Sequence, residues 1–389
     1  MSSAGGLSRR RVPASASTGD DDVDGITGPS PSNGGSVSRS DSLTSPSYHA
    51  GSAFEGGSKI AFDPRDLERD DEDARLGGKP PRLTIMEEVL LLGLKDKQGY
   101  LSFWNDNISY ALRGCILIEL ALRRRIALVR DPNRRQLPLP ERVVEVIDDR
   151  QTGETILDET LRMMKGQEQE RMSVNSWIDL LSGETWNVMK IGFQLKQVRE
   201  RLAKGLVDKG VLRTEKRNFL LFDMATHPVA DVRTKESIVT RVVALLTTTT
   251  AAVPPAALDK EGTQCRAARA VCLVCAAYAA SVLDNAFGRL TYEDREAAFQ
   301  RCDDILAEFS TWPFGSSGAG TGAARGSSGP GRRREAGARI GMGSAGVSSR
   351  EIVLGLLQEV KKEMHGEEDL SFELVAGVLE VLSKLDSLL

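Results

Sequence analysis

Apolar positions along most of the chain recur at the spacing of amphipathic helices. The run LTIMEEVLLLGL carries Thr84 as a candidate N-cap and Glu87 three residues later, which is the capping-box spacing. The run ISYALRGCILIELALRRR places Ile108 and Leu112 on or near one helical face. Both runs are therefore predicted to be helices that pack on a core.

Further segments show the same period and are also predicted to be helical. They are residues 158–165, 173–181 (with Trp177 as a core anchor), 235–246, 264–287, 292–309, 352–364 and 372–388. One stretch, AVCLVCAAYAASVL at 270–283, is apolar on every side. It is shorter than the roughly 20 residues that span a bilayer, so we expect a buried central helix.

Strand patterns are few. RVVEVID and ETILDET flank DRQTG, a turn that could close a hairpin, and NFLLFD at 218–223 has the composition of a second hairpin. The predicted fold is mainly α: a single compact helical domain with a central buried helix, surrounding amphipathic helices and a protruding β-hairpin.

The two ends of the chain differ in composition. Residues 1–80 are rich in Ser, Gly, Pro and Asp and cannot bury enough surface to offset their ordering entropy, so a disordered tail is expected. Residues 81–389 form the predicted domain, interrupted by a flexible Gly-rich insertion at 315–349. Within the tail, Arg9, Arg10 and Arg11 are either a docking motif for an acidic surface or an incidental basic trio.

Charge and cysteine content narrow the class of protein. The formal net charge of −4 does not favour nucleic acid, and the acidic residues crowd the tail, so local basic clusters must attract any anionic partner. Five cysteines within mostly apolar helical sequence indicate reduced thiols and a cytosolic setting. The first residues lack the apolar core of a signal peptide.

The most informative segment follows Trp186, where we predict one basic amphipathic helix that combines cations with an apolar stripe. The stripe that faces the core comprises Leu195, Val198, Leu202 and Leu206. Lys196 and Arg199 border it three residues apart, and such a pair can hold one phosphate between them. An ordinary solvated basic face is the alternative.

Two more features suit a membrane surface. Phe219, Leu220, Leu221 and Phe222 either form an apolar hairpin tip or pack on the domain, and the cations Lys216 and Arg217 before them favour a surface role. Trp104 and Arg113 lie near a helix start, where an indole and a guanidinium could cradle a headgroup, although a buried structural tryptophan is the alternative.

Catalytic candidates are weak. His49, His227 and His365 are scattered, and Cys272 and Cys275 lie inside an apolar helix without a second pair for zinc. The Gly-rich stretch after residue 315 has no GK[ST] and no preceding strand. We therefore expect no enzyme activity, no cofactor and no metal.

On these residues the chain resembles the Golgi phosphoprotein 3 family. The matching text is LTIMEEVLLLGLKDKQGYLSFWNDNISYALRGCILIELAL, LLSGETWN, QVRERLAKGLVDKGVL, TEKRNFLLFDMATHPV and the terminal LDSLL. The resemblance covers about residues 81–314 and 350–389. It implies a compact helical core ringed by further helices, in agreement with the periodicity.

The resemblance also implies a function. Members of the family are peripheral proteins of the cytosolic face of the Golgi, with a cytosolic pool, that bind phosphatidylinositol 4-phosphate. They retain or recycle glycosyltransferases by linking their cytosolic tails to coatomer. The headgroup pocket would comprise Trp104, Arg113, Lys196 and Arg199, while the hairpin at about 214–224 would contact membrane and form homo-oligomers. Arg9, Arg10 and Arg11 would bind coatomer and cargo tails.

Two departures and one rival interpretation qualify the resemblance. The insertion at 315–349 is not part of the family core, and Arg124 stands where the family usually has Gly. The rival is a winged-helix nucleic-acid binder, because GVLRTE and NFLLFD could form a wing after a helix. The acidic total charge and the apolar wing tip oppose it.

Overall fold

A computed structural model describes residues 78–101, 107–184, 188–219, 222–316 and 348–385. All of these belong to the unit that spans Phe62–Leu389. The predicted tail, apart from its last three residues, and residues 317–347 of the predicted insertion lie outside the described residues. Among the described helices, none is long and apolar enough to cross a membrane.

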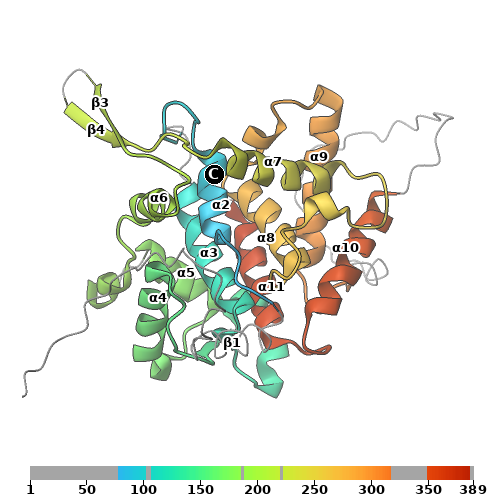
Figure 1. The fold of residues 1–389 in the computed structure, drawn as a ribbon. Coiled ribbons are helices and arrows are strands. Elements are labelled where there is room, and N and C mark those ends of the chain that lie inside the picture. Colours follow the sequence, from blue (N-terminus) through green and yellow to red (C-terminus); the bar gives the residue numbers. More distant parts are fainter. Residues whose placement is uncertain (1–77, 102–106, 185–187, 220–221, 317–347, 386–389) are drawn as a thin grey trace, which may run out of the picture. The chain divides into compact units, whose positions relative to one another are not determined.

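The described part of the chain is mainly helical, as predicted (Figure 1). Its α-helices are α2 (Ile85–Gly93), α3 (Asn107–Leu122), α4 (Thr155–Gly166), α5 (Val174–Ser182), α6 (Val198–Asp208), α7 (Val232–Thr247), α8 (Arg266–Ala279), α9 (Tyr292–Phe309), α10 (Ser349–Glu363) and α11 (Leu370–Leu382). Its short 3-10 helices are η1 (Pro132–Gln136), η2 (Leu139–Glu141), η3 (Glu168–Glu170), η4 (Val188–Phe193), η5 (Pro255–Ala257) and η6 (Leu283–Phe287).

The start of α2 is the capping box that the sequence predicts. The Thr84 side chain accepts from the Glu87 backbone N–H, and the Glu87 carboxylate accepts from the Thr84 backbone N–H at 2.8 Å. Two of the unpaired N–H groups at this helix start are thereby satisfied. α2 is buried along its whole length, so its ends need these internal partners.

The core is built from α2, α3, α8 and α11, which pack on one another. The apolar stretch predicted to be a central helix ends earlier than expected, because α8 stops at Ala279 and η6 follows. α3 is buried continuously from Ala111 to Leu122 and not on one face alone. Helical spacing identified the element but could not show that neighbours cover every side of it.

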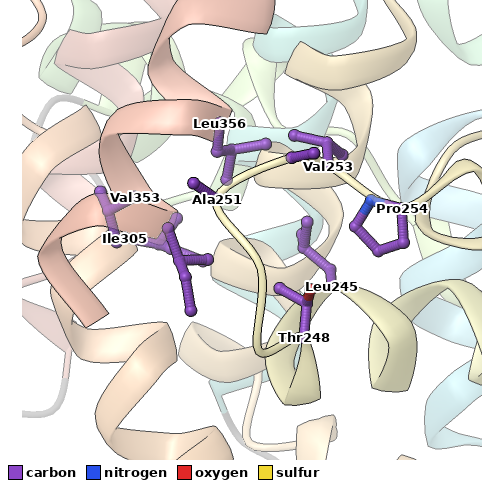
Figure 2. A pocket seen from close by; sticks show the side chains of 10 residues that line it. Leu245, Thr248, Ala251, Val253, Pro254, Ile305, Val353 and Leu356 are labelled. Carbon is purple, nitrogen blue, oxygen red and sulfur yellow. The ribbon is translucent and has the colours of Figure 1, made fainter. Parts of the chain in front are cut away.

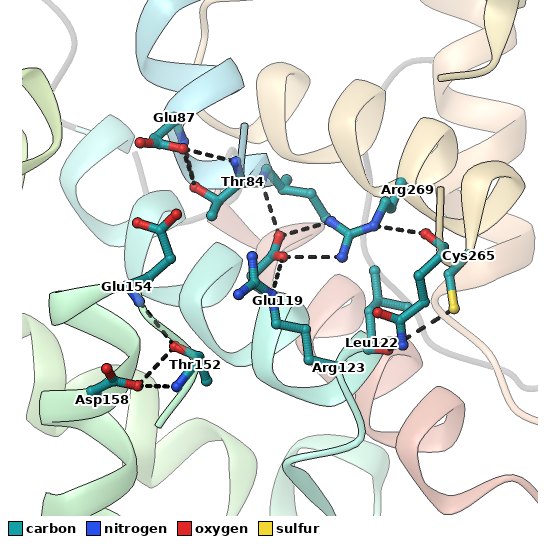
Figure 3. A network of polar contacts seen from close by, with 12 residues as sticks. Thr84, Glu87, Glu119, Leu122, Arg123, Thr152, Glu154, Asp158, Cys265 and Arg269 are labelled. Atoms are coloured by element: carbon teal, nitrogen blue, oxygen red, sulfur yellow. Dashed lines mark hydrogen bonds and ion pairs between the residues drawn. The ribbon is translucent and has the colours of Figure 1, made fainter. Parts of the chain in front are cut away.

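Polar groups inside this core are paired around Glu119. Its carboxylate accepts from Arg123 at 2.7 Å, from Arg269 at 2.9 and 3.0 Å, and from the Ile85 backbone N–H at 3.1 Å (Figure 3). Three elements, α2, α3 and α8, thus meet at one buried carboxylate. Such a group is tolerated because its charge and its acceptor positions are satisfied.

The hairpin considered around DRQTG does not form. Instead β1 (Ile126–Leu128) pairs antiparallel with β2 (Val144–Val146), which lies before the turn. The second half, ETILDET, starts α4, because the Asp158 carboxylate accepts from the Thr152 backbone N–H at 2.6 Å and fixes the turn against the first helical turn. This local hydrogen bonding competes with a strand ladder.

A second hairpin does form where the sequence predicts it. β3 (Glu215–Phe219) pairs antiparallel with β4 (Phe222–Thr226), with Glu215 opposite Thr226 and Phe219 opposite Phe222. Figure 1 shows the two strands projecting from the helices beside α6. Leu220 and Leu221 lie outside the described residues, so the packing of the apolar tip stays a prediction.

The five cysteines are free thiols, and all are buried. Burial raises the pKa of each thiol, as at Cys265, where it is raised to about 12. Cys272 and Cys275 lie within α8 among the core side chains, as predicted.

Candidate functional site

Arg113 occupies a buried position on α3, and its guanidinium is the centre of the candidate site. Nη2 donates to the Leu195 carbonyl at 2.7 Å, Nε to the Leu181 carbonyl at 3.3 Å and Nη1 to the Ser109 carbonyl at 2.8 Å. One side chain therefore ties α3 to the end of α5 and to the residues just before α6. Each partner is a neutral carbonyl, so the positive charge of Arg113 is hydrogen bonded but not neutralised.

A second cation lies close to Arg113. Burial and then the charge of Arg199 lower the pKa of Arg113 to about 10, while Glu200 acts in the opposite direction. Like charges close together are unfavourable unless an anion joins them. The structure thus brings the charge of Arg199 within reach of Arg113, although the two residues are far apart in the sequence.

Lys196 and Arg199 flank the beginning of α6 and are both exposed. In the described segments neither makes a hydrogen bond or an ion pair. The prediction of one continuous helix after Trp186 was wrong. The segment begins with the 3-10 helix η4, and the left-handed Gln197, with a φ of 53°, separates η4 from α6. Lys196 therefore lies before α6 and is not one helical turn from Arg199 on the same helix.

The start of α6 adds to the positive potential. Gln197 makes no side-chain capping hydrogen bond, so the first backbone N–H groups of the helix receive no acceptor from it. Helix N-termini favour anions through these N–H groups and the helix dipole. Glu200 in the first turn offsets part of this charge. The charges of Arg113, Lys196 and Arg199 and the N-terminus of α6 together exceed the single negative charge of Glu200. This net positive charge suits a phosphate.

The apolar stripe behind these cations is confirmed. Leu195, Val198, Leu202 and Leu206 are all buried. α6 is thus fixed to the core by one face, which leaves Arg199 at the surface. Trp104 lies outside the described residues, so its place in the pocket stays a prediction.

The base of the β3–β4 hairpin is tied to the domain. Arg217 donates to the Lys97 carbonyl and forms an ion pair with Glu215, and Lys216 is exposed. Arg217 therefore anchors the hairpin, and of the two cations predicted to face headgroups only Lys216 is fully available.

A small concavity lies elsewhere, between the end of α7, the loop that follows it, α9 and α10 (Figure 2). Its lining comprises Leu245, Thr248, Ala251, Ala252, Val253, Pro254, Ile305, Ile352, Val353 and Leu356. No charged side chain lines it, so it does not suit a phosphorylated ligand.

Comparison with known proteins assigns the chain to a family. The model of the Golgi phosphoprotein 3 family matches residues 85–324. The chain belongs to the Golgi phosphoprotein 3 family. It is 49% identical over 386 residues to the vacuolar protein sorting-associated protein 74 of Schizosaccharomyces pombe, covering 99% of this chain and 100% of the relative. It is 45% identical over 337 residues to the protein of the same name from Eremothecium gossypii, covering 85% of this chain and 90% of the relative.

Arg124 has a left-handed backbone with φ of 57°. Glycine adopts that conformation without strain, so the glycine that the resemblance leads us to expect at this position would fit the same backbone. Here the arginine gains compensating contacts, because it forms an ion pair with Asp369 at 2.5 Å and lies 5.1 Å from the centre of the Phe372 ring. The substitution thus joins α3 to the start of α11.

Sequence reasoning missed the groups that hold Arg113 in place. They are the carbonyls of Leu181, Leu195 and Ser109, together with the bend at Gln197. Every residue carries a carbonyl, so no residue type marks these acceptors. The Arg9, Arg10 and Arg11 cluster lies outside the described residues.

Proposed function

We propose that the protein is a peripheral membrane adaptor of the Golgi that binds phosphatidylinositol 4-phosphate. Family membership and the names of its relatives support a Golgi-associated sorting role without catalysis. The adaptor would retain or recycle glycosyltransferases by holding their cytosolic tails and linking them to coatomer. Arg9, Arg10 and Arg11 are the proposed contact for coatomer and cargo tails.

One observation carries the lipid-binding part of this proposal. Lys196 and Arg199 are exposed at the start of α6, no carboxylate of the described residues pairs with either, and the charge of Arg199 acts on the buried Arg113. A 4-phosphate there would receive the Arg199 fork and the Lys196 ammonium, and it would relieve the repulsion between the two arginines. Trp104 would then lie at headgroup level.

Binding by one such site is weak and reversible. A single headgroup with a shallow apolar contact gives marginal membrane affinity, so a second signal is needed for stable attachment. The hairpin tip from Phe219 to Phe222, self-association and bound cargo would supply it through avidity.

A winged-helix nucleic-acid binder is the second candidate, favoured by the succession of α6 and the β3–β4 hairpin. It needs cations along the wing, yet Arg217 is engaged with Glu215 and the Lys97 carbonyl. Nucleic-acid binding would also fall steeply with salt for every sequence tested.

Vesicle flotation across the phosphoinositide isomers tests the proposal, with duplex DNA titrated in parallel. The full chain should float with phosphatidylcholine vesicles that contain phosphatidylinositol 4-phosphate and not with phosphatidylcholine alone. Equal flotation with every isomer would reject the 4-phosphate site, and tight salt-dependent DNA binding without flotation would support the second candidate.

Charge reversal separates the site from general electrostatics. Lys196→Glu with Arg199→Glu should lower vesicle affinity by ~100-fold, because two charge-assisted contacts are replaced by repulsion. Lys204→Glu with Lys361→Glu changes the net charge equally at exposed positions on α6 and α10 and should retain binding. Arg113 is not used here, because its replacement would also break three hydrogen bonds of the fold.

A further inference from the structure

The segment between α5 and α6 exposes apolar side chains to solvent. Met189 on η4 is 88% exposed, the highest value among the large apolar side chains of the described residues, and Ile191 is 46% exposed. Both lie on the same short helix, one residue apart on either side of Lys190. Neighbouring exposed apolar groups of this size indicate a surface that another phase or molecule covers.

This segment is closed at its base. The Leu195 backbone N–H donates to the Leu181 carbonyl at 3.0 Å, and the Gln194 side-chain amide donates to the Ser182 carbonyl at 3.3 Å. Arg113 donates to both the Leu181 and Leu195 carbonyls, so the same guanidinium holds the two sides of the base together. η4 is therefore fixed beside the proposed headgroup site by the residue at the centre of that site.

The exposed cations that follow η4 complement an anionic surface. Lys190 forms an ion pair with Glu170 at 3.0 Å, while Lys196 and Arg199 make no ion pair in the described residues. Apolar side chains flanked by cations are the composition of segments that lie in the membrane interface. A protein partner would need carboxylates facing the cations and an apolar pocket as well, whereas an anionic bilayer supplies both together.

We propose that η4 inserts Met189 and Ile191 into the bilayer that carries the phosphoinositide. This contact rests on the proposed function and adds to it a second apolar anchor, distinct from the β3–β4 hairpin. Because Arg113 ties the base of η4 to the headgroup site, that site and the apolar side chains of η4 reach the membrane together and not one after the other.

The first test compares vesicles with the soluble headgroup. Met189→Ser with Ile191→Ser should weaken binding to phosphatidylcholine vesicles containing phosphatidylinositol 4-phosphate by ~10-fold or more, since partial burial of two apolar side chains is lost. Affinity for soluble inositol 1,4-bisphosphate should not change. Leu354→Ser, at a similarly exposed position on α10, is the matched control and should bind vesicles normally.

The outcomes separate the two proposals. Unchanged vesicle binding by the Met189 and Ile191 variant, while Lys196→Glu with Arg199→Glu loses binding, would overturn the insertion of η4 alone. Retained vesicle binding by the charge-reversed variant would overturn the headgroup site itself.

The second test reports insertion directly. All five native cysteines are buried, so a solvent-sensitive fluorophore can be placed selectively at Met189→Cys or at Leu354→Cys. The probe at position 189 should shift to the blue with phosphoinositide vesicles, and the probe at position 354 should not. A shift that follows protein concentration without vesicles would show that a second copy of the chain covers η4, and no shift on bound vesicles would also overturn the proposal.

Discussion

Two groups of cations in this protein behave in opposite ways. Arg123 and Arg269 are buried against Glu119, and although burial raises the pKa of that carboxyl, the two arginines lower it to about 2 (Figure 3). Arg113 is also buried but faces carbonyls and another cation, and its pKa is lowered to about 10. Glu119 thus neutralises the buried charge of Arg123 and Arg269, whereas the charge of Arg113 is hydrogen bonded but not neutralised, and the proposed phosphate site rests on that difference.

Removing the Glu119 carboxylate should have the largest effect on the free energy of unfolding. Glu119→Ala leaves Arg123 and Arg269 buried without a counter-charge and should lower the free energy of unfolding by about 3–5 kcal/mol. Chemical denaturation measures it. Glu380→Ala, which breaks a partly exposed pair with Lys384, should lower the free energy of unfolding by no more than about 1 kcal/mol. Equal losses in the two variants would contradict the special importance of the buried Glu119.

Arg113 has two roles in this comparison, because its hydrogen bonds hold the fold and its charge contributes to the proposed phosphate site. Arg113→Lys keeps the charge but cannot bond the Leu181 and Leu195 carbonyls with one planar fork, so we expect a loss of about 1–3 kcal/mol in stability. Thermal unfolding measures it, with the exposed Arg162→Lys as control. Wild-type stability would show that the base of η4 does not depend on the fork.

The pH dependence of folding stability tests a second buried carboxylate, that of Glu88. Burial raises the pKa of Glu88 to about 7 despite its ion pair with Arg241. The folded state therefore binds this proton more tightly than the unfolded chain, so the contribution to stability is full below pH 4.5 and is lost as the pH rises through about 7.

Glu88→Gln should remove this dependence of folding stability on pH. Between these pH values the wild type should lose ~2–3 kcal/mol more stability than the variant. Denaturant titrations at several pH values measure the difference. Parallel curves for the two proteins would mean that folding does not raise the pKa of Glu88.

The smallest effect concerns Arg124, whose largely buried ion pair with Asp369 accompanies a left-handed backbone. Both Arg124→Ala and Arg124→Gly remove the ion pair with Asp369. The alanine keeps a Cβ in the left-handed conformation and therefore keeps the backbone strain, whereas the glycine relieves it. The alanine variant should be less stable than the glycine variant by about 1 kcal/mol in thermal unfolding. Equal stability would mean that the left-handed conformation costs nothing here.

The sequence predicts those parts of the fold that local signals specify. The capping box at Thr84, the β3–β4 hairpin and the full extent of α9 follow from residue types and spacing. The strand at 144–146 pairs with the preceding segment 126–128 and not with the segment after the DRQTG turn. In that turn the Thr152 backbone N–H donates to the Asp158 carboxylate at the start of α4, so the second strand does not form. Alternation of apolar residues alone does not reveal this local hydrogen bond.

The candidate site was only partly predictable. Spacing predicted that Lys196 and Arg199 share a helical face, but Lys196 lies before the start of α6. The resemblance to the family was needed to add Arg113, whose carbonyl partners carry no sequence signal. The break at Gln197 was missed because glutamine does not mark a left-handed residue, and η4 was read as part of one longer helix.

The central claim is that Lys196 and Arg199 hold a phosphate on the surface of a stable fold. Calorimetric titration of soluble inositol 1,4-bisphosphate into the full chain and into the Lys196→Glu, Arg199→Glu variant tests it without a membrane. We predict saturable binding to the wild type and loss of that binding in a variant with unchanged thermal stability. Equal affinity in the two proteins would contradict the account.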